Sequence, residues 1–269
     1  MEQADEAILR HYETIQEEDR ISIGFGQLAL ARVKEKLGRH LPPPPASILD
    51  IGGATGIHAG WLAEMGYEVQ IIDIAPRHVA KANAELGSLG VVAQRGDAGS
   101  LSAPENGCDA VLLFGPLYHL AESRDRLGAL NEACRVVRPG GVVAVAAVSR
   151  FASLFDGLAR SYLFDPNFVP IVERDLAEGQ HRNPDDRPHW FTTAFMHHPD
   201  QLRQEVAEVG LTVSELVGLE GLAGWLGHLA ARWDDRADRE RILWAARMVE
   251  KEPTLLGLSA HLLLVARKP

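Results

Sequence analysis

The sequence of 269 residues contains little cysteine and no surplus of basic residues. Its two cysteines, Cys108 and Cys134, form no C-x-x-C pair, and both fall in apolar patterns that are typical of buried free thiols. We therefore expect neither a metal site nor a redox pair from them. The formal net charge of −10 argues against a broad binding surface for nucleic acid or for an anionic membrane. A small-molecule substrate fits this charge better.

Long hydrophobic runs are missing as well. No apolar stretch approaches the length that a membrane span requires. Residues 1–6 are acidic, where a signal peptide would be basic and then apolar. We therefore expect a cytoplasmic protein with no membrane partner. Because 46% of the residues are hydrophobic, the chain can form one large α/β core, and we expect a single domain.

The stretch of residues 48–73 organises the chain. It begins with a short apolar run that contains Asp50, continues through a glycine-rich turn and an amphipathic segment, and ends in a second apolar run that closes on Asp73. This order predicts a strand, a tight loop, a helix and a second strand, which together make a βαβ unit. Glycines in such a loop let backbone amides approach a ligand, and an acid after the second strand is placed to bind a ribose diol.

The glycine spacing separates two classes of cofactor. A dinucleotide-binding G-x-G-x-x-G pattern that starts at Gly52 would need glycine at Ala54 and Ile57, and neither position has it. The spacing that is present, Asp50-x-Gly52-x-Ala54-x-Gly56, resembles the D/E-x-G-x-G-x-G loop of class I S-adenosylmethionine-dependent methyltransferases, with Ala54 in the place of the middle glycine. The alternative is a turn in which the glycines have only a conformational role.

The third predicted strand, residues 91–94, ends in Arg95-Gly96-Asp97-Ala98. This segment resembles the place where an acid of the family accepts the adenine amino group; the alternative is that Asp97 only caps the next element. The resemblance implies S-adenosylmethionine as the cofactor. The cofactor contacts that it implies are Asp50, Gly52, Gly53, Ala54, Gly56, Asp73, Ile74, Asp97, Ala98, Phe114 and Gly115.

The fourth predicted strand, residues 109–114, runs into the loop Gly115-Pro116-Leu117-Tyr118-His119-Leu120. Carboxyl ends of parallel strands form the ligand crevice of a doubly wound sheet, so Tyr118 and His119 are expected to face the substrate. An Asn/Asp-Pro-Pro-Tyr segment, which would indicate methylation of an amide or base nitrogen, is absent, and the loop resembles that of small-molecule methyltransferases. His119 is the first candidate general base. The alternative is a packing histidine that shapes the pocket.

A helix is predicted over residues 123–137, followed by Arg138-Pro139-Gly140-Gly141 and an apolar run over residues 141–149. The tetrapeptide resembles the turn that precedes the fifth strand in the family. Residues 46–149 thus match the cofactor-binding core. The resemblance implies a doubly wound, Rossmann-like α/β fold: a mainly parallel seven-stranded sheet with an antiparallel last strand, plus helical cap insertions.

Residues 1–45 are predicted to form an N-terminal helical arm with a hinge at Gly24-Phe25-Gly26. In many members of the family such an arm lies across the cofactor mouth. Arg20 is therefore a candidate contact of the cofactor carboxylate, and Tyr12 a candidate substrate contact. The alternative for Arg20 is a solvated surface charge.

Residues 150–198 interrupt the α/β rhythm with many aromatic residues, and we expect them to form a substrate cap. Trp190 and His197 are candidate substrate contacts, and His189 is the second candidate base. The alternative is that these side chains only pack the insertion onto the core. His189, His197 and His198 lack a recognised ligand spacing, so no metal is expected.

The alternation of helices and strands resumes in residues 199–269. A sixth strand is predicted over residues 211–219, and the last strand over residues 261–267. A helical insertion at about residues 220–258 separates these two strands. It is expected to add either a wall of the substrate pocket or a homodimer contact, and the sequence does not choose between them.

The predicted reaction is direct displacement, in which the protein aligns a nucleophile behind an activated methyl group and excludes water. Two alternatives come from other classes. A non-catalytic S-adenosylmethionine-binding or scaffolding protein would retain the fold without turnover, and Ala54 in a glycine position favours it slightly. A nicotinamide-dependent oxidoreductase is disfavoured by the glycine spacing and by the lack of a Tyr-x-x-x-Lys pair.

Overall fold

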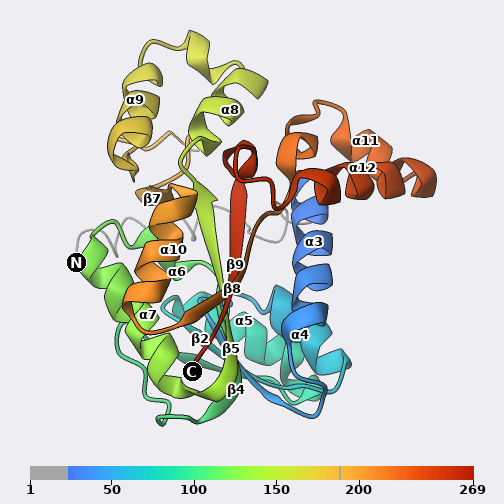
Figure 1. Cartoon of the computed structure of the whole chain (residues 1–269), viewed down its shortest axis with the longest axis vertical. Helices are drawn as coiled ribbons and strands as arrows, with labels where there is room; N and C mark the ends of the chain where they lie inside the picture. The colour runs from blue at the N-terminus through green and yellow to red at the C-terminus, as the bar shows by residue number, and fades with distance from the viewer. Residues whose placement is uncertain (1–23, 188) are drawn as a thin grey trace. The chain divides into compact units, whose positions relative to one another are not determined.

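The computed structural model describes residues 24–187 and 189–269 (Figure 1). The chain divides into two compact units. The first, which we call the core unit, comprises Leu37–Ala146, Leu202–Glu215 and Leu264–Pro269. The second, the insertion unit, comprises the described residues up to Lys36 together with Ala147–Gln201 and Leu216–Leu263. The expectation of a single domain stays a prediction.

The core unit contains a parallel sheet in the order β3-β2-β1-β4-β5. Its central strands are buried on both faces, as the continuous apolar runs of the sequence predict. Helix α7 lies on one side of the sheet, and α4 and α5 lie on the other (Figure 1). The doubly wound α/β fold is therefore confirmed. The elements are β1 Ser47–Ile51, α4 Ile57–Glu64, β2 Glu68–Asp73, α5 Pro76–Leu86, η1 Gly87–Leu89, β3 Val92–Arg95, β4 Cys108–Leu113, α6 Pro116–His119, α7 Ser123–Val136 and β5 Val137–Ser149.

Strand β5 begins earlier than the sequence indicates. It starts at Val137, directly after α7, and includes Arg138-Pro139-Gly140-Gly141, which we expected to form a turn. The register against β4 shifts here, because Cys108 pairs with Val137 while Ala110 already pairs with Val142. The expected turn is therefore an irregular first part of the strand, and the φ of +74° at Gly140 lets the backbone make this adjustment.

The last strand is antiparallel, as expected. Strand β9 (His261–Arg267) pairs with β5 and with β8 (Thr212–Gly218). The N–H of Gly140 donates to the carbonyl oxygen of Lys268, and the N–H of Ser149 donates to that of Ala260. Residue numbers therefore rise along β5 as they fall along β9. Helix α10 (Pro199–Glu208) precedes β8.

The insertion unit holds two short strands that the sequence analysis missed. Strand β7 (Ala194–His197) pairs in parallel with the end of β5, and β6 (Gln180–His181) pairs antiparallel with β7. The sheet of the described residues thus has nine strands, whereas seven were expected. The helices that belong wholly or mostly to this unit are α3 Phe25–His40, α8 Ala152–Ala159, η2 Tyr162–Phe164, α9 Val169–Glu178, η3 Gly221–Trp225, α11 Leu229–Trp233, α12 Arg236–Val249 and η4 Leu256–Leu258.

Two apolar clusters stabilise the insertion unit. One joins α3 to η3, α11 and α12 through Leu28, Ala223, Leu229, Trp233, Ile242 and Leu243. The other joins Trp190 to α9 through Phe168, Ile171 and Val172. In residues 24–187 and 189–269, none of the helices has the length and apolarity needed to cross a bilayer.

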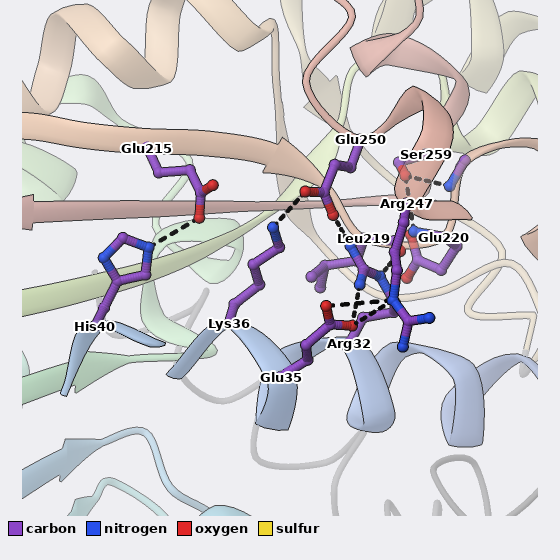
Figure 2. A network of polar contacts seen from close by, with 11 residues as sticks. Arg32, Glu35, Lys36, His40, Glu215, Leu219, Glu220, Arg247, Glu250 and Ser259 are labelled. Atoms are coloured by element: carbon purple, nitrogen blue, oxygen red, sulfur yellow. Dashed lines mark hydrogen bonds and ion pairs between the residues drawn. The ribbon is translucent and has the colours of Figure 1, made fainter. Parts of the chain in front are cut away.

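A buried ionic network also joins α3 to the end of α12 (Figure 2). The side chains of Arg32 and Lys36 are fully buried, and both contact the carboxylate of Glu250, with Lys36 Nζ 2.5 Å from Glu250 Oε1. Glu35 contacts Arg32 and accepts from Arg247 Nε at 3.0 Å. Buried cations require such partners, because an isolated charge loses its hydration on burial.

Candidate cofactor site

The glycine-rich turn leaves β1 with three residues in the left-handed region. The φ angles are +73° at Gly52, +48° at Ala54 and +91° at Gly56. The N–H of Gly52 donates to the carbonyl oxygen of Ile72 at 2.7 Å, which joins the turn to β2. Ala54 therefore occupies a backbone conformation that favours glycine, which gives a physical reason for the glycine of the family pattern at this place.

The turn has no room for side chains at its glycines. A Cβ atom on Gly52 would lie 2.5 Å from Cδ of Pro116, and one on Gly56 would lie 2.3 Å from Cδ1 of Leu86. At Gly53, a Cβ would lie 2.7 Å from Oδ2 of Asp50. Glycine at these places therefore allows close packing of the backbone, as a loop that wraps a ligand requires.

Asp73, at the end of β2, stabilises this turn by accepting hydrogen bonds. Its Oδ2 accepts a hydrogen bond from the N–H of Ala54 at 2.9 Å, and its Oδ1 accepts one from the N–H of Ala75 at 2.9 Å. The Nδ1 of His78, which is buried on α5, lies 3.2 Å from Oδ1. A carboxylate has about four lone-pair sites, so Asp73 retains acceptor capacity for ligand hydroxyls. Its neighbour Ile74 is half-buried. Sequence reasoning found Asp73 but missed His78, which looks like an ordinary helix residue.

Asp50 lies beneath the turn and is fully buried. Within the described part of the chain, neither of its carboxylate oxygens has a hydrogen-bond partner. Burial, and second the negative charge of Asp73, raise the pKa of Asp50 to about 7. An unpartnered buried carboxyl group of this kind can adjust its charge to a ligand.

The loop after β4 lies directly against the turn. Gly115 has a φ of +123°, and a Cβ on it would lie 3.3 Å from the carbonyl oxygen of Gly52. Phe114 is buried, and the ring of His58 packs edge-on against it with a centroid distance of 5.0 Å. The structure thus brings the first and fourth strand ends together, as predicted from the sheet topology. His58, in the first turn of α4, was missed because a helical histidine carries no motif.

Tyr118 and His119 follow on the short helix α6. Both are half-buried, and their rings lie 4.9 Å apart. The chain after them is held by Arg126 of α7, whose Nη1 donates to the carbonyl oxygens of Leu120 at 3.0 Å and Ala121 at 2.7 Å. Arg126 is only 1% exposed and also pairs with buried Glu205, whose Oε1 lies 2.7 Å from Nη2. This ion pair positions the loop that carries His119.

Asp97 lies in an exposed turn after β3. Its Oδ1 accepts a hydrogen bond from the N–H of Gly99 at 2.8 Å, and Ala98 between them is half-buried. This is the capping role that aspartate often takes in turns. Contact of Asp97 and Ala98 with an adenine ring stays a prediction.

Comparison with known proteins gives the family. The family model described as a methyltransferase domain matches residues 48–141. A ubiquinone biosynthesis O-methyltransferase of Methylobacterium sp. (strain 4-46) is 30% identical over 212 residues, which cover 74% of this chain and 76% of that protein. The chain belongs to the S-adenosylmethionine-dependent methyltransferase family.

Other members of the methyltransferase family match over shorter lengths. A malonyl-[acyl-carrier protein] O-methyltransferase of Methylococcus capsulatus is 33% identical over 142 residues, 46% of this chain and 50% of that protein. The chain spans about half the length of the first curated relatives that it matches.

The solved structure of an S-adenosylmethionine-dependent methyltransferase from Mesorhizobium loti has the same fold, with a TM-score of 0.61, 17% identity and coverage of 90% of this chain and 100% of that one.

The residues of the turn fit the cofactor of this methyltransferase family. S-Adenosylmethionine has a ribose diol, a sulfonium and an ammonium group. The core unit offers the Asp73 carboxylate for the diol and the buried carboxyl group of Asp50 for positive charge, beside glycines that carry no Cβ.

The other predicted site positions of the methyltransferase belong to the insertion unit or to residues that the structure does not describe. Trp190 is buried in the insertion unit, with its ring 5.1 Å from that of Phe168. His197 is fully buried on β7, and His189 is exposed. Their roles toward a substrate stay predictions. Tyr12 and Arg20 lie outside the described residues.

The remaining candidate residues of the methyltransferase are its cysteines and the side chains that could bind a metal ion. Cys108 and Cys134 are free thiols and are half-buried, where we expected buried thiols. Burial and then the charge of Asp109 raise the pKa of Cys108 to about 12, which keeps this thiol unreactive at neutral pH. Among residues 24–187 and 189–269, no three His, Cys, Asp or Glu side chains are grouped so that they could hold a metal ion.

Proposed function

We propose that this methyltransferase transfers a methyl group from S-adenosylmethionine to a small-molecule acceptor by direct displacement. The observation that carries the proposal is the turn at Gly52, which packs against the loop of Gly115 and is fastened to β2 by Asp73. Family membership supports the choice of cofactor.

The core unit would hold the cofactor through the turn. Asp73 would accept hydrogen bonds from the ribose hydroxyls, Asp50 would face positive charge, and Asp97 would accept the adenine amino group. Gly53 and Gly115 would let the ligand approach the backbone. When it is bound, the sulfonium makes the methyl carbon electrophilic without further activation.

The protein's own contribution to catalysis is alignment of the acceptor, exclusion of water and removal of a proton where the acceptor arrives protonated. We assign the proton removal to His119, which the Arg126–Glu205 pair positions through the carbonyl groups that follow it. His189 is the second candidate. We retain residues 150–198 as the substrate cap, with Trp190 and His197 as its contacts.

A hydroxyl group is the first candidate acceptor. The relative with 76% coverage is named an O-methyltransferase of ubiquinone biosynthesis, whereas the malonyl group named for the Methylococcus relative offers a carboxylate oxygen. We therefore propose an aromatic hydroxyl as the acceptor. We also propose a cytoplasmic location and a homodimer.

The test is a transfer assay with the full chain, methyl-labelled S-adenosylmethionine and a panel of phenols, catechols, carboxylates, amines and thiols. Labelled product from a phenol or catechol supports the proposal. His119→Ala should lower turnover by about 10²-fold or more with little change in cofactor affinity. The exposed His228 provides the matched control, since His228→Ala should leave turnover unchanged. Cofactor binding without product from any acceptor would favour the non-catalytic alternative.

A further inference from the structure

Asp50 is an unusual group in the core unit. It lies on β1 between Ile71 of β2 and Leu112 of β4, and none of its surface reaches solvent. Neither carboxylate oxygen finds a donor among the described residues, and a Cβ atom added to Gly53 would lie only 2.7 Å from Oδ2. A buried carboxylate without hydrogen bonds is costly, so a carboxyl group at this place favours its neutral form.

The charged neighbours reinforce this preference. Asp73, at the end of β2, is the charged group whose field acts on Asp50, and its negative charge raises the pKa of Asp50 further toward about 7. The other titratable groups of the site face elsewhere: His78 of α5 reaches Asp73, His58 of α4 packs on Phe114, and His119 of α6 packs on Tyr118. No described cation contacts Asp50.

We propose that Asp50 carries a proton in the cofactor-free protein and gives it up when the positively charged methyl donor binds, so that donor binding releases a proton to solvent. This inference rests on the proposed function, because it assumes the donor at this turn. The O–H bond of the carboxyl group breaks, the electron pair stays on oxygen, and the proton passes to the buffer. The carboxylate then faces positive charge of the ligand.

The donor is a better trigger than its product. S-Adenosylmethionine carries a sulfonium and an ammonium group, whereas the demethylated thioether has lost the sulfonium charge. Opposite charges attract strongly where water is excluded, so the ionised form of Asp50 is stabilised more by the donor than by the product. Proton release should therefore be larger for the donor. As the product forms, Asp50 regains affinity for a proton, which favours product release.

The sign of the pH dependence follows from linkage. Asp50 in the cofactor-free state has its pKa near 7, and in the donor-bound state its pKa is lower, so the bound state holds fewer protons. Donor affinity therefore rises with pH, by up to about tenfold per unit below pH 7, and levels off above it. With full ionisation on binding, the protons released are about 0.9 at pH 6, 0.5 at pH 7 and 0.1 at pH 8.

The test is isothermal titration of the full chain with S-adenosylmethionine, at each of these pH values, in two buffers of different ionisation enthalpy. The difference in heat between the buffers counts the protons released. Asp50→Asn, which keeps the shape and removes the acid, is the variant, and circular dichroism checks that it folds. The α-amino group of the cofactor titrates in the same pH range. Its contribution to the number of protons released cancels in the comparison of wild type with Asp50→Asn.

Proton release that falls from pH 6 to pH 8 in the wild type and is lost in Asp50→Asn supports the inference. Equal proton counts in both proteins, or a wild-type count that does not change with pH, would overturn it. If Asp50→Asn does not fold, the difference in proton count between the donor and its demethylated product decides the matter, because both ligands carry the same α-amino group. Equal counts for the two ligands would then overturn the inference. A folded wild-type chain that binds neither donor nor product would overturn the proposed function itself, and this inference with it.

Discussion

The ion pair of Arg126 and Glu205 is expected to stabilise the segment that directly follows His119. The perturbation is Arg126→Met, which keeps much of the side chain's length and removes the guanidinium. It leaves Glu205, only 5% exposed, without the partner that contacts both of its carboxylate oxygens. It also removes the donor to the carbonyl oxygens of Leu120 and Ala121.

The magnitude follows from this geometry. Removing one partner of a buried ion pair costs about 3–5 kcal/mol, because the remaining charge stays buried and uncompensated. Loss of the donor to two carbonyl groups adds to the destabilisation of the local loop. Replacing both partners, as in Arg126→Met with Glu205→Leu, removes the uncompensated charge. We therefore expect this double variant to be more stable than Arg126→Met alone by about 1 kcal/mol or more.

The assay is urea unfolding followed by circular dichroism, which gives the free energy of unfolding by linear extrapolation. Arg124→Met is the matched control, because Arg124 lies on the same helix with its side chain 88% exposed, and it should cost less than about 0.5 kcal/mol. A loss of under about 1 kcal/mol for Arg126→Met would refute the reasoning. A double variant that is less stable than Arg126→Met would also refute the reasoning, because the destabilisation would then not come from the buried charge of Glu205.

Three further predictions concern backbone strain and buried charge. Ala54→Gly should raise the free energy of unfolding by about 0.5–1 kcal/mol in urea titration, since a φ of +48° favours glycine; an unchanged or lower value would show that the turn is unstrained. Gly56→Ala should lower it by about 2 kcal/mol in the same experiment, through its φ of +91° and the clash with Leu86, and an effect below about 0.5 kcal/mol would contradict the packing. Glu250→Gln should cost about 3 kcal/mol or more in thermal unfolding, because the buried cations Arg32 and Lys36 both lose the negative charge of Glu250. The exposed Glu85→Gln is its control, and equal losses for both would contradict this account.

The core unit could be predicted from local patterns because its strands are continuous apolar runs and its turn carries glycines at a fixed spacing. β4 lies within one residue of its predicted bounds, β1 begins one residue before the predicted start at Ile48, and Gly52 begins the turn as expected. Such features are decided by burial and by backbone conformation, which short stretches of sequence record.

Other features depend on contacts between distant residues, which no local pattern records. Arg32 and Lys36 look like surface charges on an amphipathic helix, yet both are fully buried because Glu250, more than 200 positions away, lies against them. Arg126 is buried for the same reason, with Glu205 as its distant partner. Strand β7 has only four residues, too few for a period to be recognised, and it exists because the end of β5 offers a partner.

The central claim is that the turn beginning at Gly52 forms the cradle of S-adenosylmethionine. Equilibrium dialysis of the full chain with the labelled cofactor tests it most directly. We predict saturable binding that the demethylated product displaces and that Gly52→Ala weakens by about tenfold or more, because a Cβ there would collide with Pro116. A folded wild-type chain that retains no cofactor at millimolar concentration would contradict the claim.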